Sequence, residues 1–114
     1  MAEQIRFEDF EKVDIRVGEI VEVRDFPKAR KPLYRLRVDF GPGFGEMHSA
    51  AGLPDSYPER ESLLGKQVFA VVNFPPRRIA DFESQCLILG VPDEAGGLSL
   101  LDPDRRVPLG GKVF

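Results

Sequence analysis

The 114-residue chain combines 42% hydrophobic and 31% charged residues with a formal net charge of −3. This composition is typical of a folded globular protein and excludes the class of hydrophobicity-poor disordered chains, and the length predicts one compact domain over residues 1–114. A single cysteine and a single histidine exclude an internal disulfide and a Cys/His zinc cage, so we expect neither a metal nor a cofactor.

Charge is segregated along the chain. Residues 1–22 carry seven acidic and three basic side chains, whereas residues 24–37 carry six basic and one acidic. The negative total argues against indiscriminate binding to polyanions, since such affinity grows with the number of phosphates neutralised. A local excess still builds a positive field, which makes the basic stretch a candidate ligand surface.

The first elements predicted are a short helix and a long strand. An apolar residue recurs every three positions from Phe7 to Val13, and acidic side chains crowd the start of this stretch, as at a helix N-terminus. From residue 14 to residue 23 the period changes to two, which predicts a half-buried strand. Gly18 would permit a bend or bulge in that strand.

Two further strands and a helical turn are expected in the middle of the chain. The two prolines in residues 25–33 predict a loop. The strand that follows the loop alternates, and its predicted inward residues are Leu33, Leu36, Val38 and Phe40. A third strand is predicted at residues 47–51 and a helical turn at residues 62–64.

The last third of the chain is the most apolar. Residues 66–74 predict a strand buried on both faces that ends at Pro75 and Pro76, and residues 85–91 predict another buried strand. A short strand near residue 98 follows a turn, and the tail after residue 107 should be ordered only if it packs against the rest.

This order of elements predicts an all-β fold. Five or six short strands with a helical insertion after the third fit a five-stranded antiparallel OB-fold barrel with short flanking helices. Such barrels often bind oligonucleotides, but a fold suggests a function by analogy only.

Two long segments resemble a known family. FEKVDIRVGEIVEVRDFPKARKPLYRLRVDFG resembles the opening of the tRNA-binding domain that is fused to some methionyl- and phenylalanyl-tRNA synthetases, and VVNFPPRRIADFESQCLILG resembles its second signature. The order of segments along the whole chain is similar to that of the stand-alone CsaA-type proteins of this family, which are export-associated chaperones. The resemblance implies a homodimeric binding module without catalysis. We therefore expect a chaperone that binds unfolded or preprotein peptides in support of export, with the secretion apparatus as a further partner, and that can also bind tRNA. The alternative is a dedicated tRNA-binding or structured-RNA-binding module without a chaperone role.

Three residues depart from the pattern of that family. Asp81 stands where relatives usually have a turn glycine, Gln85 where they commonly have glutamate, and Ala50 where CsaA-type relatives often have a second serine. Aspartate tolerates the left-handed backbone region less well than glycine does. These departures bear on RNA affinity more than on the fold.

Arg77 and Arg78 are the first candidates for RNA contacts. A proline-stiffened loop would hold their planar guanidiniums in place for bidentate phosphate contacts. The alternative is a solvated turn with ion pairs to Asp81 or Glu83. The full predicted RNA-binding set is Lys28, Arg30, Lys31, Arg35, Asn73, Arg77, Arg78, Ser84 and Gln85.

Several of these predictions have structural alternatives. Asn73 and Ser84 could equally cap the turn backbone, and Arg35 with Arg37 could merely solubilise the outer face of a strand. Phe26 and Tyr34 could stack on bases or pack in the core.

Apolar residues near both chain ends and beside the proline pair predict a peptide-binding or dimer surface, although in a monomer the terminal ones could close the barrel instead. This set is Phe7, Phe10, Phe74, Pro75, Pro76, Ile79, Val107 and Phe114.

Catalysis and a membrane location have little support. Cys86 is expected to be a buried structural thiol, and a hydrolase using His48 with Cys86 or Ser84 is only a minor alternative. The N-terminus has no signal-peptide pattern and no apolar run could span a bilayer, which predicts a cytoplasmic protein without membrane insertion.

Overall fold

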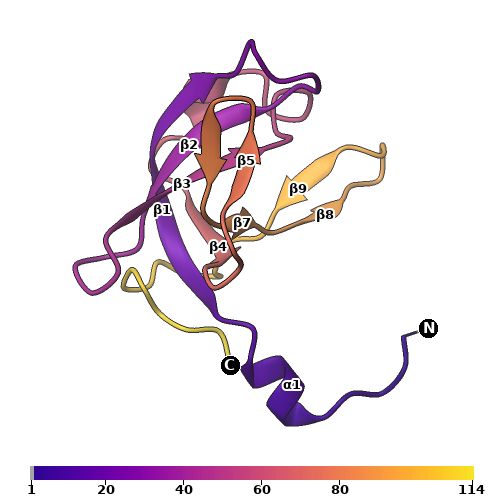
Figure 1. Ribbon diagram of the computed structural model, residues 1–114, viewed down its shortest axis with the longest axis vertical. Coiled ribbons are helices and arrows are strands. Elements are labelled where there is room, and N and C mark those ends of the chain that lie inside the picture. Colours follow the sequence, from indigo (N-terminus) through magenta and orange to yellow (C-terminus); the bar gives the residue numbers. More distant parts are fainter. Residues whose placement is uncertain (1) are drawn as a thin grey trace.

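The computed structural model describes residues 2–114 and has a five-stranded antiparallel sheet that curls into a nearly closed barrel (Figure 1). The sheet has the order β3-β2-β1-β4-β7, and two separate two-stranded hairpins, β5–β6 and β8–β9, project from it. The predicted all-β OB-type barrel is therefore confirmed. The elements are α1 (Phe7–Glu11), β1 (Ile15–Asp25), β2 (Tyr34–Asp39), β3 (Glu46–Ala51), the 3-10 helix η1 (Arg60–Leu63), β4 (Gln67–Val71), β5 (Arg77–Ile79), β6 (Phe82–Ser84), β7 (Leu87–Ile88), β8 (Gly90–Pro92) and β9 (Leu98–Leu100).

Strand alternation places the core inside the barrel. Along β2 every second residue is buried, and Tyr34 takes the inner position that we expected for Leu33, which is only half-buried. The core also receives residues from the other barrel strands, from the segment before η1 and from η1 itself, because each contributes an apolar residue to the same enclosed space. Its fully buried members include Val17, Ile20, Leu36, Val38, Phe40, Leu53, Leu63 and Val68.

Gly18 in β1 permits a close approach between strands. A Cβ at this position would lie 2.6 Å from Cγ1 of Val38 and 2.8 Å from Cε1 of Phe40. The register shift that we expected at the glycine lies instead between Ile20 and Glu22, where β1 pairs with β2. Gly18 is thus required for packing, and the bulge occurs further along the strand.

Side chains close the barrel between β3 and residues 84–86, which begin at the last residue of β6. The Ala50 amide donates to Ser84 Oγ at 3.1 Å, and the His48 amide donates to Gln85 Oε1 at 2.8 Å. Only the Gln85 amide forms a backbone bond across this gap, to the His48 carbonyl at 2.8 Å. We call this contact the seam. Two of the predicted RNA-binding residues, Ser84 and Gln85, therefore have structural partners.

A buried serine completes the seam. Ser49 has no exposed surface, and its hydroxyl donates to the Cys86 carbonyl at 2.8 Å. A buried carbonyl that loses its donor costs more than the bond itself contributes, because water cannot replace the partner. This hydroxyl is therefore the close donor to the Cys86 carbonyl, which the Ser84 hydroxyl approaches only at 3.5 Å.

The chain from residue 85 to 91 differs from the buried strand that we expected. Leu87 and Ile88 pair with β4, the Leu89 amide donates to the Phe69 carbonyl at 2.9 Å, and Leu87 is 49% exposed. At Gly90 the chain leaves the barrel and pairs with β9, where a Cβ would lie 2.9 Å from the Ser99 carbonyl oxygen. The apolar run therefore divides between the barrel and an exposed ribbon.

The hairpin β5–β6 was not predicted, because the proline pair before it indicated a loop. Its two-residue turn consists of Ala80 and Asp81. The left-handed residue is Ala80, with φ of 53°, and not Asp81 as the family pattern suggested. An alanine in this region is mildly strained, since its Cβ crowds the backbone.

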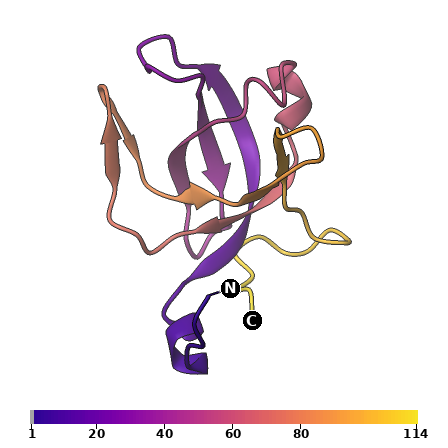
Figure 2. The ribbon, with the colours of Figure 1, turned by 90° about the vertical axis from the view of Figure 1, so that its right-hand side faces the viewer.

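Helix α1 and the C-terminus lie near each other beyond one end of the barrel (Figures 1 and 2), whereas the segment before α1 extends away from the C-terminus in Figure 1. The predicted helix α1 is present, and no residue of it is buried within the described chain. The tail is ordered because its backbone pairs with β1, through Gly110 to Val17 and Val113 to Ile15. No helix among residues 2–114 has the length and apolar character needed to cross a membrane.

Substitution of Gly18 by alanine should destabilise the barrel by about 1–3 kcal/mol, the usual cost of overpacking. Urea unfolding measures this cost. Gly43→Ala is the matched control, because nothing lies within 4 Å of a Cβ at that position. Equal unfolding midpoints for the two variants would contradict the close approach.

Ser49→Ala should lower the free energy of unfolding by about 1–3 kcal/mol, because it leaves the Cys86 carbonyl without its 2.8 Å donor. The exposed Ser62→Ala serves as the control. Thermal denaturation should separate the two, and an S49A midpoint equal to that of S62A would show that the hydroxyl does not hold the seam.

Candidate functional site

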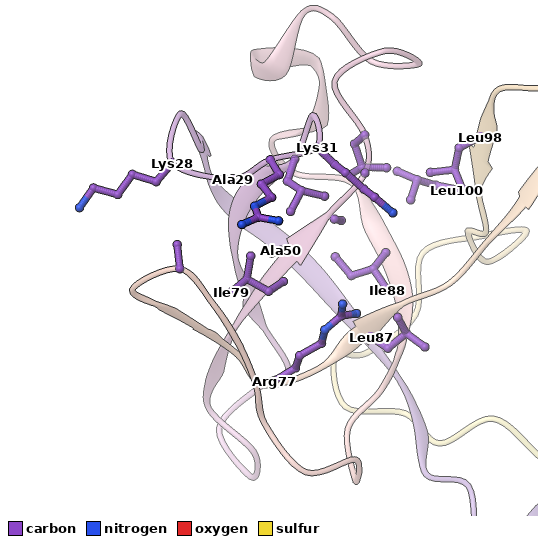
Figure 3. A pocket seen from close by; sticks show the side chains of 16 residues that line it. Lys28, Ala29, Lys31, Ala50, Arg77, Ile79, Leu87, Ile88, Leu98 and Leu100 are labelled. Atoms are coloured by element: carbon purple, nitrogen blue, oxygen red, sulfur yellow. The ribbon is translucent and has the colours of Figure 1, made fainter.

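A groove of about 700 Å³ lies between the loop at residues 26–33 and the hairpin β5–β6 (Figure 3). Its floor is apolar and includes Leu33, Ile88 and Leu100. Four cations from these two walls line it, and none of its lining residues is acidic: Lys28, Arg30, Lys31 and Arg77. We call this feature the basic groove. Such a surface attracts anions, because no carboxylate in the lining offsets the positive field.

Alternation along β5 separates the two adjacent arginines. Arg77 and Ile79 line the basic groove, whereas Arg78 is paired across the hairpin with Glu83 and is absent from the lining. Both guanidinium-bearing residues are exposed, and within residues 2–114 neither forms a salt bridge. Figure 3 shows the Arg77 guanidinium turned into the groove. Arg77 is therefore the better placed of the two for a ligand in the groove.

Lys28 has an acidic partner outside the groove lining. Its Nζ lies 2.8 Å from Oδ2 of Asp81, at the tip of the hairpin, and both side chains are more than half exposed. The lysine lowers the pKa of the Asp81 carboxyl through this hydrogen bond and its charge, so Asp81 is ionised at neutral pH. The pair joins the loop wall of the groove to the hairpin wall.

The arginines of β2 lie on the outer face of the barrel, as the solubilising alternative predicted. Arg37 forms salt bridges with Glu22 and Glu46 at 3.3 and 2.8 Å. Arg35 donates from Nε to the Asp25 carbonyl, and neither arginine lines the basic groove. The predicted set of RNA-binding residues is thus larger than the set that the groove brings together.

The two candidate stacking aromatics are buried, which agrees with the core-packing alternative. Tyr34 is 4% exposed and donates its hydroxyl to the Tyr57 carbonyl at 2.8 Å, and burial raises its pKa. Phe26 is 6% exposed and packs edge-on against Phe82, with 5.5 Å between ring centroids. Neither ring presents a face on which a base could stack.

Asn73 joins the end of β4 to the segment between α1 and β1. Its Nδ2 donates to the Lys12 carbonyl at 2.7 Å, and its Oδ1 accepts from the Asp14 amide at 3.0 Å. Of the two roles left open by the sequence, the geometry favours a backbone cap over a contact with RNA.

The predicted apolar set divides between two places. Phe74, Pro75 and Ile79 line a smaller pocket of about 280 Å³ that shares Arg77 and Leu87 with the basic groove. The exposed Phe7 and Phe114 belong instead to the chain ends, where Phe10 is half-buried. Val107 is also half-buried, and both of its backbone polar groups bond to the side chain of Gln67. Pro76 is exposed beside the smaller pocket without lining it.

The hydrolase alternative lacks an activated nucleophile. Burial raises the pKa of the Cys86 thiol to about 11, and Sγ faces the backbone carbonyl of His48 at 4.0 Å. The Ser84 hydroxyl is engaged by the Ala50 amide. Among residues 2–114 no group of three or more His, Cys, Asp and Glu residues is placed to hold a metal ion.

Comparison with known sequences identifies relatives over almost the whole chain. The family model described as "Putative tRNA binding domain" matches residues 15–112. The methionine–tRNA ligase of Pyrococcus horikoshii is 43% identical over 111 residues, which is 97% of this chain and 15% of that enzyme. The corresponding ligase of Porphyromonas gingivalis is 42% identical over 113 residues, 99% of this chain and 16% of the enzyme. The chain thus spans a small part of these curated relatives.

Solved structures of similar length match as well. The CsaA chaperone protein of Picrophilus torridus has a TM-score of 0.89 at 43% identity, covering 97% of this chain and 100% of that one. The chaperone CsaA of Bacillus anthracis has a TM-score of 0.90 at 42% identity, covering 98% and 100%. A MetRS-related protein of Pyrococcus horikoshii has a TM-score of 0.86 at 30% identity, covering 99% and 100%. The resemblance drawn from the two sequence segments is confirmed, and the chain belongs to the tRNA-binding domain family, a family of non-catalytic OB-type binding modules.

Proposed function

We propose that the protein is a non-catalytic RNA-binding module that holds tRNA, or a similarly structured RNA, in the basic groove. The observation that carries this proposal is the lining of the groove, in which four cations surround an apolar floor without an acidic residue. The membership of the chain in the tRNA-binding domain family supports the same ligand. A tRNA ligand would place the protein in the cytoplasm.

The groove divides the task of binding between two kinds of contact. The planar guanidinium of Arg77 can donate two parallel hydrogen bonds to one phosphate, while the cations of the loop at residues 26–33 follow the RNA backbone. The floor around Leu33 and Ile88 offers an apolar surface to a ribose or a base. Phosphate contacts of this kind position RNA without reading its sequence.

Arg77→Ala should weaken tRNA binding about tenfold at low salt and reduce the slope of log K against log salt by about 0.7 to 0.9 units, as expected for the loss of one phosphate contact. Fluorescence anisotropy with labelled tRNA at several salt concentrations measures both. Arg105→Ala is the control, since Arg105 is exposed, pairs only with its neighbour Asp104 and lies outside the groove. Equal losses in the two variants would remove Arg77 from the site.

A second candidate ligand is an extended polypeptide, as in an export-associated chaperone that hands preproteins to the secretion apparatus. The observation that favours it is the continuity of the basic groove with the smaller pocket, which adds the exposed Phe74 and Pro75 to the apolar surface. Two solved structures similar to this chain are named CsaA chaperones. Binding to apolar peptide should respond little to salt, whereas binding to RNA should fall steeply.

We also propose that two copies associate through their chain ends. In α1, Phe7 is 67% exposed, and Ile5 just before it is 68% exposed. The terminal Phe114 is fully exposed, and the C-terminus lies near α1 in both views (Figures 1 and 2). A symmetric partner would cover these apolar side chains and place two basic grooves in one particle.

Ile5→Ser combined with Phe7→Ser should convert the dimer to a monomer at micromolar concentration, because it removes two exposed apolar side chains from the proposed interface. Light scattering coupled to size exclusion reports the mass. Leu64→Ser is the control, since Leu64 is 49% exposed and follows η1, at the opposite end of the barrel in Figure 2. A double variant that keeps the mass of a dimer would place the interface elsewhere.

A further inference from the structure

The tip of the hairpin β5–β6 supplies a carboxylate to a cation of the basic groove. Asp81 Oδ2 accepts a hydrogen bond from Lys28 Nζ at 2.8 Å, although the two residues are 53 positions apart in the chain. In Figure 3 the Lys28 side chain extends away from the centre of the groove, whereas the Arg77 side chain points into it. One of the four groove cations is therefore already bound to an anion of the protein itself.

We propose that Asp81 is a built-in competitor for RNA phosphate: its carboxylate binds Lys28, and a phosphodiester must move that carboxylate away before Lys28 contributes its full charge to binding. The inference deepens the proposed RNA-binding function and rests on it. A lysine ammonium has three N–H donors, so the carboxylate does not block every site on Nζ. Two anions on one ammonium repel each other, however, so the bound carboxylate weakens the hold of Lys28 on a phosphate.

The exposure of the pair makes the exchange feasible. The Lys28 side chain is 68% exposed and that of Asp81 is 62% exposed, and ion pairs this open to water are weak. A phosphate that approaches along the groove therefore meets little resistance from the pair. The same pair ties the two walls of the groove together, so its release would also free the hairpin tip from the loop.

Neither of the other charged residues near the hairpin tip replaces a member of the Asp81–Lys28 pair. Arg35 lies close enough to Asp81 to act on it through its charge, but Arg35 is held by the Asp25 carbonyl and lies 5.4 Å above the ring of Phe26. Glu83 alternates to the face of the hairpin that carries Arg78, away from the groove lining. Asp81 is thus the hairpin carboxylate that bears on the groove.

Binding of tRNA by Asp81→Asn, an isosteric variant, tests the proposal. At low salt the Kd should fall about two- to fivefold, the factor expected for an exposed ion pair, and the dependence of log K on log salt should steepen as Lys28 gains a phosphate. Glu83→Gln removes the same charge from the other face of the same hairpin and should change the Kd clearly less. An equal gain in both variants would mean that overall charge alone acts, and would overturn the proposal.

A double-mutant cycle assigns the effect to the pair. In a Lys28→Ala background, Asp81→Asn should lose most of its effect, because the competed cation is absent. A gain that persists without Lys28 would overturn the assignment. If Arg77→Ala weakens tRNA binding while Asp81→Asn leaves it unchanged, the proposed function stands and the competitor role fails.

A second ligand keeps the test independent of tRNA. Inorganic pyrophosphate, followed by the amide NMR shifts of residues 26–33, should bind Asp81→Asn more tightly than wild type. If no variant binds tRNA, the proposed function fails, and this titration alone decides whether Asp81 competes for Lys28. If Asp81→Asn changes the affinity for an acidic peptide but not the affinity for tRNA, RNA is not the ligand that displaces Asp81, and the proposal fails.

Discussion

The structure depends on how its barrel closes. Between β3 and the chain at residues 84–86, side chains of Ser49, Ser84 and Gln85 supply hydrogen bonds that a continuous strand ladder would otherwise provide. This closure uses only residues 84–86, and Ser84 is the last residue of β6, so the hairpin β5–β6 is anchored to β3 at its base and otherwise pairs within its own two-stranded sheet. The hairpin can therefore stand over the groove and present Arg77 there. A full ladder along this edge would have pulled the same residues into the barrel wall.

The distribution of free and paired cations follows from the same geometry. Outer-face arginines such as Arg37 lie across from acidic residues on neighbouring strands and are neutralised by them. The groove is lined instead by a loop and a hairpin tip, whose neighbours across the opening are apolar floor residues and other cations. Among residues 2–114, the one carboxylate that forms a salt bridge with a groove cation is that of Asp81 at the hairpin tip, with Lys28. The basic groove thus keeps its field although the chain as a whole is acidic.

The sequence predicted the barrel strands well because their signals are local. Alternation fixed the inner face of β2 apart from the exchange of Leu33 for Tyr34, whose polar hydroxyl reaches the Tyr57 carbonyl at the barrel end. The apolar run after Gln85 was misassigned, because periodicity cannot show that the chain leaves the barrel at Gly90 to pair with β9. Long-range pairing of this kind is decided by tertiary contacts and not by local pattern.

The site was only partly predictable for a related reason. The candidate polar residues Asn73, Ser84 and Gln85 were chosen by their neighbourhood in the sequence to the two arginines, but their partners lie far away in the chain. Residue type alone does not separate a structural amide from a ligand contact, since both use the same donors and acceptors. The sequence marked Asp81 as a departure from the family pattern that bears on RNA affinity, whereas its contact with Lys28 is visible only in the structure.

The two proposed surfaces meet at Asn73. Its amide holds the backbone of Lys12 and Asp14, directly after α1, and the next four residues lead through the proline pair to Arg77. Prolines restrict the backbone of this connection, so the direction in which β5 leaves is set close to the point where Asn73 is anchored. A partner chain seated on α1 would therefore bear on the segment that orients Arg77. If two copies associate through α1 as proposed, Asn73 is the side chain that links their interface to the connection before Arg77.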